Sequence, residues 1–174
     1  KAMDAFKKAV EIDSFVNMAR INLAYMLSMD GKLAEAEKVY LKVVEQEPNY
    51  GNAWYSLGLL YSEQKNYNKA EASFDKASMR MPGNIRIFYN RALCLQKLER
   101  NADAARAFES GLRNFPGDKR SQSFTETLYA LILLQLDMGL KELAMKNADF
   151  LNKIVGKNHP YMRFIGEKVQ ALQK

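Results

Sequence analysis

The sequence predicts an all-α protein built from antiparallel helix pairs, and three observations support this. Apolar and small residues recur at helical spacing in two short stretches, residues 54–61 and 70–77. A turn at residues 66–68, Asn-Tyr-Asn, separates the two stretches, and Pro82 stops the second one. The whole pattern then recurs at a distance of 34 residues in both directions. Such an internal period is typical of proteins that stack identical helical units.

Small residues recur where two helices of a pair must cross. The alanine of the second helix and the closing proline are present in three successive units, at Ala36, Ala70 and Ala104 and at Pro48, Pro82 and Pro116. Gly58 and Ala70 would let two backbones approach closely, while Trp54 and Phe74 fill the space beside them. A larger residue at Gly58 should overpack the crossing, at a cost of about 1–3 kcal/mol.

In its period, its aromatic positions and its closing proline, the chain resembles the tetratricopeptide repeat family over nearly its whole length. The resemblance implies a right-handed α-solenoid, the superhelix of this family, and a role in binding proteins. Two residues depart from the family pattern. Arg20 takes the place that Trp54 has in the next repeat, and Arg91 takes the place of Leu57. We expect these departures to weaken individual helix pairs without changing the fold.

The period divides the chain into six segments. We expect the second helix of a truncated repeat at 1–16, whole repeats at 17–50, 51–84 and 85–118, an irregular fourth repeat at 119–157 and a C-terminal capping helix at 158–174. The cap would begin at Asn158 or His159, and its apolar stripe would be Met162, Ile165, Val169 and Leu172. Because the first segment lacks its partner helix, we expect a longer parent protein, and a homodimer through the truncated end is a further expectation.

Composition excludes several classes of protein. The net charge of +6 is concentrated toward the end of the chain, where residues 119–174 hold nine basic and five acidic side chains. This drift favours an acidic partner, but the basic residues are too dispersed for nucleic-acid binding to be expected. No apolar run of about 18 residues predicts a membrane span. The single cysteine excludes an internal disulfide, and both cytoplasm and periplasm stay open as locations.

No constellation of residues predicts catalysis. The one histidine, His159, and the one cysteine, Cys94, fall in different units, too far apart for a nucleophile and its base. We interpret His159 as part of a helix start and Cys94 as a buried, inert thiol. Metal-ligand spacings and phosphate-binding glycine loops are missing as well, so neither a cofactor nor a metal is expected, and the chain is predicted not to be an enzyme.

The first helices of the pairs should line a concave groove. The residues predicted to face it are Ile21, Asn22, Tyr25, Asn52, Tyr55, Leu59, Arg86, Tyr89, Asn90, Leu93 and Tyr129. Tyrosine offers a large contact area and a hydroxyl at little entropic cost, so Tyr55 and Tyr89 are candidate anchors for a bound peptide. The alternative is that these tyrosines only fill space between helices.

Some tetratricopeptide proteins hold the acidic C-terminus of chaperones through a clamp of Lys, Arg and Asn on the first helices. The five corresponding positions here hold Ile21, Tyr25, Ser56, Arg86 and Asn90, and among these only Arg86 is retained. The resemblance therefore implies a module that binds an apolar or mixed peptide or helix of a partner. The alternatives are a structural spacer or self-association element, and an accessory C-terminal tail of a larger, enzymatic parent.

Overall fold

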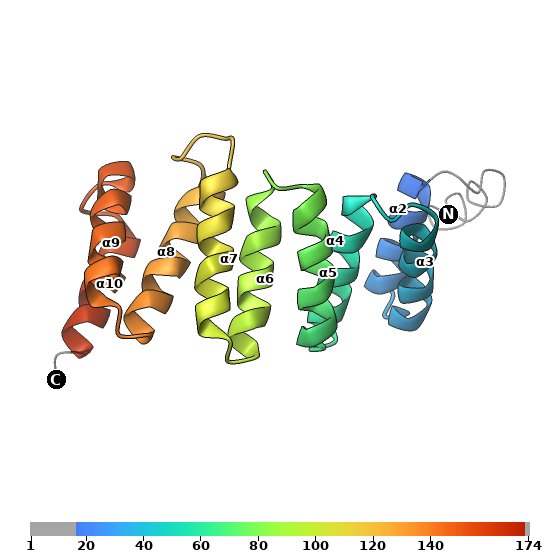
Figure 1. Ribbon diagram of the computed structural model, residues 1–174, viewed down its shortest axis with the longest axis horizontal. Helices are drawn as coiled ribbons and strands as arrows, with labels where there is room; N and C mark the ends of the chain where they lie inside the picture. The colour runs from blue at the N-terminus through green and yellow to red at the C-terminus, as the bar shows by residue number, and fades with distance from the viewer. Residues whose placement is uncertain (1–16, 173–174) are drawn as a thin grey trace. The chain divides into compact units, whose positions relative to one another are not determined.

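A computed structural model describes residues 17–172, which form nine α-helices and no strand (Figure 1). The predicted helix of the truncated repeat at 1–16 lies outside the described residues. The helices are α2 (Asn17–Met29), α3 (Leu33–Gln46), α4 (Gly51–Glu63), α5 (Tyr67–Arg80), α6 (Ile85–Lys97), α7 (Asn101–Asn114), α8 (Gln122–Asp137), α9 (Lys141–Val155) and α10 (Pro160–Ala171).

Consecutive helices pack as pairs, α2 with α3, α4 with α5, α6 with α7 and α8 with α9. Each predicted repeat between residues 17 and 157 contains one pair. The chain divides into two compact units, one ending at Met81 and the other beginning at Pro82, and each is described by itself. Unit 1 contains α2–α5 and unit 2 contains α6–α10. The prediction of an all-α fold of helix pairs is confirmed.

Every turn within a pair contains one residue in the left-handed conformation. These residues are Gly31, Lys65, Glu99 and Gly139, with φ of 76°, 58°, 59° and 73°. The next N–H in each turn then bonds back to the preceding helix, as from Asn66 to the Tyr61 carbonyl at 2.8 Å, which closes the helix end. The sequence marks the two glycine turns. The turn predicted at residues 66–68 begins one residue after Lys65, because lysine seldom adopts this conformation.

The close crossing predicted at Gly58 is present in unit 1. Leu57 and Phe74 are fully buried, and a Cβ atom on Gly58 would lie 2.5 Å from the Phe74 ring. Trp54 is only half-buried. Its indole N–H donates to the Pro48 carbonyl at 2.9 Å, which ties the start of α4 to the end of the preceding repeat.

In the first repeat a polar contact replaces the tryptophan. Arg20 is 2% exposed and one of the largest buried side chains in unit 1. Its guanidinium donates to the Gln46 side chain on α3 and, at 3.4 Å, to Asn17 one turn earlier on α2. Burial of a charge is tolerated only where such partners are available. Arg20 therefore joins the two helices of its pair through hydrogen bonds.

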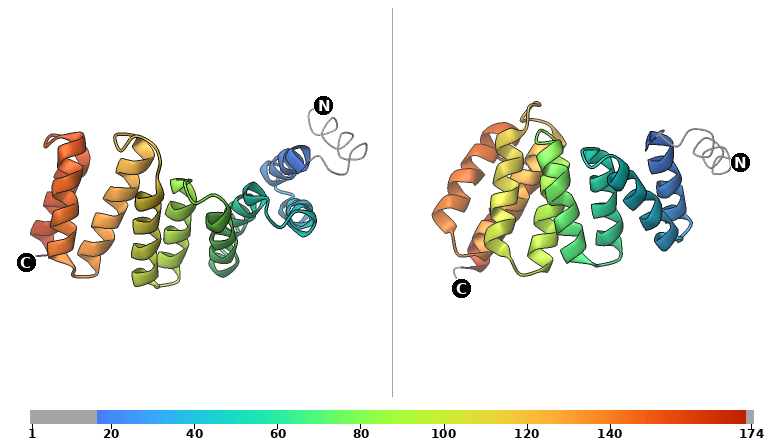
Figure 2. Two further views of the ribbon diagram at one scale, coloured as in Figure 1. Left: turned by 45° about the horizontal axis from the view of Figure 1, so that its top comes forward. Right: turned by 45° about the vertical axis from the view of Figure 1, so that its right-hand side comes forward.

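The capping helix α10 packs against α8 and α9 of unit 2 (Figure 2). The His159 Nδ1 accepts the Tyr161 N–H at 3.3 Å, so the predicted cap residue is the one that caps. Lys168 pairs with Asp137, at the end of α8, at 2.6 Å. Ile165 is buried at 2% exposure, but Leu172 is 58% exposed. The predicted apolar stripe is wrong at Leu172, which closes the last turn of α10 and leaves most of its side chain in water.

Candidate interaction surfaces

The predicted groove residues lie on the first helices of both units, and we call this surface of each unit its inner face. In unit 1 it comprises Ile21, Asn22, Tyr25, Asn52, Tyr55 and Leu59. In unit 2 it comprises Arg86, Tyr89, Asn90, Leu93 and Tyr129. Ile21 is buried; Asn22, Tyr55, Tyr89, Asn90 and Tyr129 are half-buried; Tyr25, Asn52, Leu59, Arg86 and Leu93 are exposed.

The two candidate anchor tyrosines pack inside their own helix pairs. The Tyr55 ring lies 5.8 Å from the Phe74 ring on α5. The Tyr89 ring lies 5.7 Å from the Phe108 ring on α7, nearly edge to face. Phe74 and Phe108 are fully buried, so each tyrosine ring packs against the core of its repeat. Packing, one of the two alternatives drawn from the sequence, is therefore present at both tyrosines, and groove lining stays a prediction.

One slot of the inner face presents a large apolar side chain to solvent in three successive repeats. Tyr25, Leu59 and Leu93 follow one another at 34-residue intervals and are 60%, 43% and 39% exposed. Met18 and Met29, at the two ends of α2, are 54% and 72% exposed. Exposed large apolar groups that recur on one face are typical of interaction sites.

A small hollow of about 110 Å³ lies beside this slot in unit 1. Tyr25 and Met29 of α2 line it together with Ser56 and Leu59 of α4, and the buried Tyr40 of α3 lies beneath. Burial raises the pKa of the Tyr40 hydroxyl, although a hydrogen bond with Ser56 lowers it in part. The hollow therefore combines apolar walls with hydroxyl groups and the carboxylate of Glu63, which suits an apolar side chain with a polar neighbour.

In unit 2 the inner face carries an ion pair over tyrosine. The Arg86 guanidinium lies 3.5 Å from the Glu126 carboxylate and 5.9 Å from the centre of the Tyr89 ring. Burial raises the pKa of Tyr89 and the charge of Glu126 raises it further, while Arg86 opposes them. Tyr89 is thus a neutral hydroxyl at physiological pH, next to one cation and one carboxylate.

Tyr129 lies under the capping helix. Its ring stacks on that of Tyr161 with centroids 4.2 Å apart and planes 9° apart, and the His159 ring meets Tyr161 edge-on at 4.6 Å. Sequence reasoning missed Tyr161 as a neighbour of the inner face. The sequence offered no clear signal, because the helices that carry Tyr129 and Tyr161 meet only after folding.

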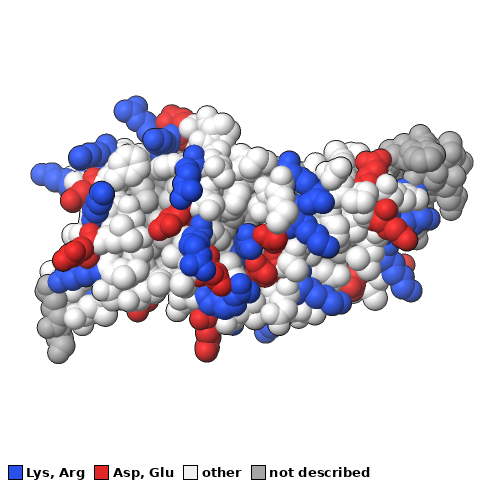
Figure 3. Space-filling view, viewed as in Figure 1, with Lys and Arg blue, Asp and Glu red and all other residues white. Residues whose placement is uncertain are grey.

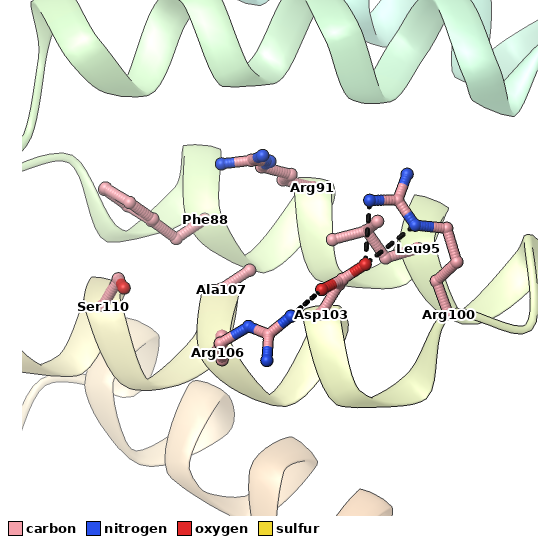
Figure 4. A pocket seen from close by; sticks show the side chains of 8 residues that line it. All are labelled: Phe88, Arg91, Leu95, Arg100, Asp103, Arg106, Ala107 and Ser110. Carbon is pink, nitrogen blue, oxygen red and sulfur yellow. Dashed lines mark hydrogen bonds and ion pairs between the residues drawn. The ribbon is translucent and has the colours of Figure 1, made fainter.

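A second surface of unit 2 gathers arginines between α6 and α7. It encloses about 190 Å³ and includes Arg91, Arg100 and Arg106 around Asp103. Figure 4 shows Arg100 and Arg106 on either side of the Asp103 carboxylate, with the Arg91 guanidinium directed away from it. Arg100 bonds Asp103 at 2.8 Å, and Arg106 bonds its other oxygen. These hydrogen bonds lower the pKa of Asp103. The cluster is an exposed ion-pair network.

Charges of both signs are interspersed on the face drawn in Figure 3, with basic groups projecting at the loop between α7 and α8. Within residues 17–172, no three side chains of His, Cys, Asp and Glu are grouped so as to hold a metal ion. No helix in that span is long and apolar enough to cross a bilayer. Cys94 is buried.

Comparison with known proteins places the fold. A family model described as tetratricopeptide repeat matches residues 39–72, a window that begins in α3 and ends in α5. The crystal structure of YrrB, a TPR protein with an unusual peptide-binding site, superposes with a TM-score of 0.77 at 22% identity, covering 98% of this chain and 85% of that one. The crystal structure of MamA gives 0.71 at 18% identity, covering 98% and 88%.

The relatives that this chain matches in sequence are much longer proteins, and each match covers a small part of the relative. The human protein O-mannosyl-transferase TMTC3 is 28% identical over 115 residues, which is 64% of this chain and 12% of that protein. The probable UDP-N-acetylglucosamine–peptide N-acetylglucosaminyltransferase SPINDLY of Hordeum vulgare is 26% identical over 89 residues, 47% of this chain and 9% of the relative. The chain therefore spans about a tenth of the length of these curated relatives.

Proposed function

We propose that this chain, a tetratricopeptide-repeat protein, works as a non-enzymatic module that holds a short segment of a partner protein on the inner faces of its repeats. Helix pairs of this fold serve protein–protein interaction in general, and the finer assignment to the inner face is ours. The observation that supports it is the repeated exposure of Tyr25, Leu59 and Leu93. The unusual peptide-binding site ascribed to YrrB is consistent with the same use here.

The partner segment should be apolar with polar flanks. Tyr25 and Leu59 offer contact area, and the hollow between them accepts one apolar side chain. Asn52 lies exposed on the inner face of unit 1 and Arg86 on that of unit 2, and each can bond the backbone of an extended or helical segment. Tyr55 and Tyr89 would hold the neighbouring side chains in place, since each ring packs against a buried phenylalanine. For one short segment we expect micromolar affinity, on the order of −8 kcal/mol.

The test is selection of peptides from a random displayed library, followed by titration calorimetry of a selected peptide. The triple variant Tyr25→Ser/Leu59→Ser/Leu93→Ser should lose binding at least tenfold while keeping its helix content. The matched control is Leu41→Ser/Met79→Ser/Leu143→Ser, which removes three exposed apolar groups, 43%, 69% and 42% exposed, from second helices. The control should bind as the wild type does. Equal losses in both variants would contradict the proposal.

A second candidate function rests on the relatives. Transferases of sugars contain a related segment that is about a tenth of their length, which favours a role as an accessory part of a larger enzyme. In that case the same inner face would recruit the acceptor protein. The chain by itself should transfer no sugar to a peptide. Turnover by this chain alone would contradict the non-enzymatic assignment.

A further inference from the structure

An open hollow of about 480 Å³ lies in unit 2, where α8 begins, α9 ends and α10 begins. Its lining comes from three elements of the fourth repeat and the cap: Arg120, Gln122, Thr125, Ile154, Val155, His159 and Tyr161. None of the exposed apolar residues of the inner face contributes to it. The hollow is therefore a site distinct from the inner face of unit 2.

The hollow is lined by one guanidinium and by polar side chains that can each donate a hydrogen bond. Arg120 contributes a guanidinium, Gln122 an amide and Tyr161 a hydroxyl. His159 accepts the Tyr161 N–H with its Nδ1, so in the neutral ring the proton resides on Nε2. That Nε2–H is the group the ring can offer to a ligand. No carboxylate is among the lining residues.

The charged residues around the hollow are mostly basic, like Arg120 in its lining. Lys119 precedes Arg120 in the loop, and its ammonium lies 5.7 Å from the centre of the Phe150 ring on α9. Lys153 and Lys157 precede and follow Ile154 and Val155 in the sequence and are exposed. The acidic neighbours are Asp118, whose carboxylate accepts the Arg120 backbone N–H at 2.9 Å, and Asp149, exposed on α9 one turn before Lys153. Cations thus outnumber carboxylates in the two segments that supply the hollow, residues 118–125 and 149–161.

We propose that this hollow binds an acidic segment of a partner protein, with a carboxylate held by Arg120 and His159. The fork of a guanidinium matches a carboxylate and bonds it with two parallel hydrogen bonds. Ile154 and Val155 form a floor for the aliphatic part of the same Asp or Glu side chain. The excess of basic residues in 119–174, nine against five acidic, draws such a segment toward this end.

The position of Tyr161 connects the two surfaces. One ring lines the hollow and also stacks on Tyr129 of the inner face at 4.2 Å. A partner with an acidic stretch next to an apolar stretch would therefore contact both sites of unit 2. The two sites still share no exposed anchoring residue, so they can be inactivated one at a time.

The test uses a fluorescein-labelled peptide of alternating Asp and Gly, and its counterpart with Asn for Asp, in anisotropy titrations at low salt. The wild-type chain should bind the Asp peptide at least tenfold more tightly than the Asn peptide, and less tightly as salt is added. Arg120→Ala should weaken binding about 5- to 10-fold, since it removes a charge-assisted contact. His159→Ser keeps an oxygen to cap α10 but removes the ring donor, and should also weaken binding.

Two controls separate the site from net charge. Arg106→Ala removes the same charge from the other arginine cluster of unit 2 and should leave the affinity unchanged. The variant Tyr25→Ser/Leu59→Ser/Leu93→Ser should bind the Asp peptide as the wild type does, even where it has lost its library-selected peptide. Equal affinity for the Asp and Asn peptides, equal losses in Arg106→Ala and Arg120→Ala, or tighter binding of a single-stranded RNA of similar charge would each overturn the proposal.

Discussion

Tyr55 on α4 packs its ring against Phe74 on α5, with centroids 5.8 Å apart and planes at 50°. One period later Tyr89 meets Phe108 at 5.7 Å. Leu59, one turn beyond Tyr55, instead leaves 43% of its surface exposed. The tyrosine position thus contributes to the stability of the pair, and the leucine position is the one that a partner can reach.

Substitution of Tyr55 and of Leu59 should distinguish the packing residue from the exposed one. Tyr55→Ala should lower the free energy of unfolding by about 2 kcal/mol or more, because it removes a half-buried ring and an aromatic pair. Leu59→Ala should cost less than about 1 kcal/mol, since much of the side chain is already in water. Urea unfolding followed by circular dichroism measures both. A larger loss for Leu59→Ala would show that the leucine is the packing residue.

The crossing at Gly58 leaves no room for a methyl group. Gly58→Ala would bring a Cβ within 2.5 Å of the Phe74 ring, and we expect a destabilisation of about 1–3 kcal/mol from overpacking. Gly166 is the matched control, since it is also helical but has nothing within 4 Å of a built Cβ. Gly166→Ala should stabilise α10 by about 0.5–1 kcal/mol through helix propensity. Thermal unfolding of the two variants should shift in opposite directions.

Lys65 and Glu99 adopt the left-handed conformation in their turns, which costs conformational free energy in the folded state. Glycine occupies the same position at Gly31 and Gly139. Lys65→Gly and Glu99→Gly should therefore stabilise the chain by up to about 1 kcal/mol, less the entropy that glycine adds to the unfolded chain. Gly139→Ala should destabilise by a similar amount. Chemical denaturation would measure the free energy of unfolding of all three variants. A lower stability of Lys65→Gly would contradict the inference that Lys65 is strained.

The hydroxyl of Tyr61 should make stability depend on alkaline pH. It donates to the Glu37 carboxylate at 2.7 Å, and burial together with that bond and charge raises its pKa well above the ordinary value of 10.0. A raised pKa favours the neutral form in the folded state. Its contribution to stability is therefore complete below about pH 10 and is lost as the pH rises through the folded-state pKa.

Tyr61→Phe tests this contribution. The variant should be less stable than the wild type at neutral pH, and the difference should shrink as the solution becomes strongly alkaline. Tyrosinate absorbance followed into strongly alkaline solution should show that the last-titrating fraction decreases when Tyr61 is removed. Tyr67→Phe on the neighbouring helix is a suitable control, because it removes a tyrosine without touching the Glu37 bond. Identical titration curves for the two variants would contradict the role of Glu37.

Much of the helical framework was readable from residue patterns, and the misses have physical causes. The period located Gly58 against Phe74, and Pro160 with His159 located the start of α10, because close crossings and helix starts depend on residues near in sequence. The turn at Lys65 was predicted one residue late, since lysine does not signal a left-handed conformation. The stack of Tyr161 on Tyr129 was missed, because it joins residues whose helices meet only after folding.

The sequence by itself determined the helix pairs and their 34-residue period, because backbone hydrogen bonding and apolar spacing are local properties of the chain. Only the tertiary structure decided which inner-face residues stay exposed. Tyr55 turned out to rest on a buried phenylalanine while Leu59 stayed open to solvent. The gathering of Arg120, His159 and Tyr161 around one hollow was likewise decided there. Burial depends on what another helix places over a side chain, and spacing along one helix does not contain that information.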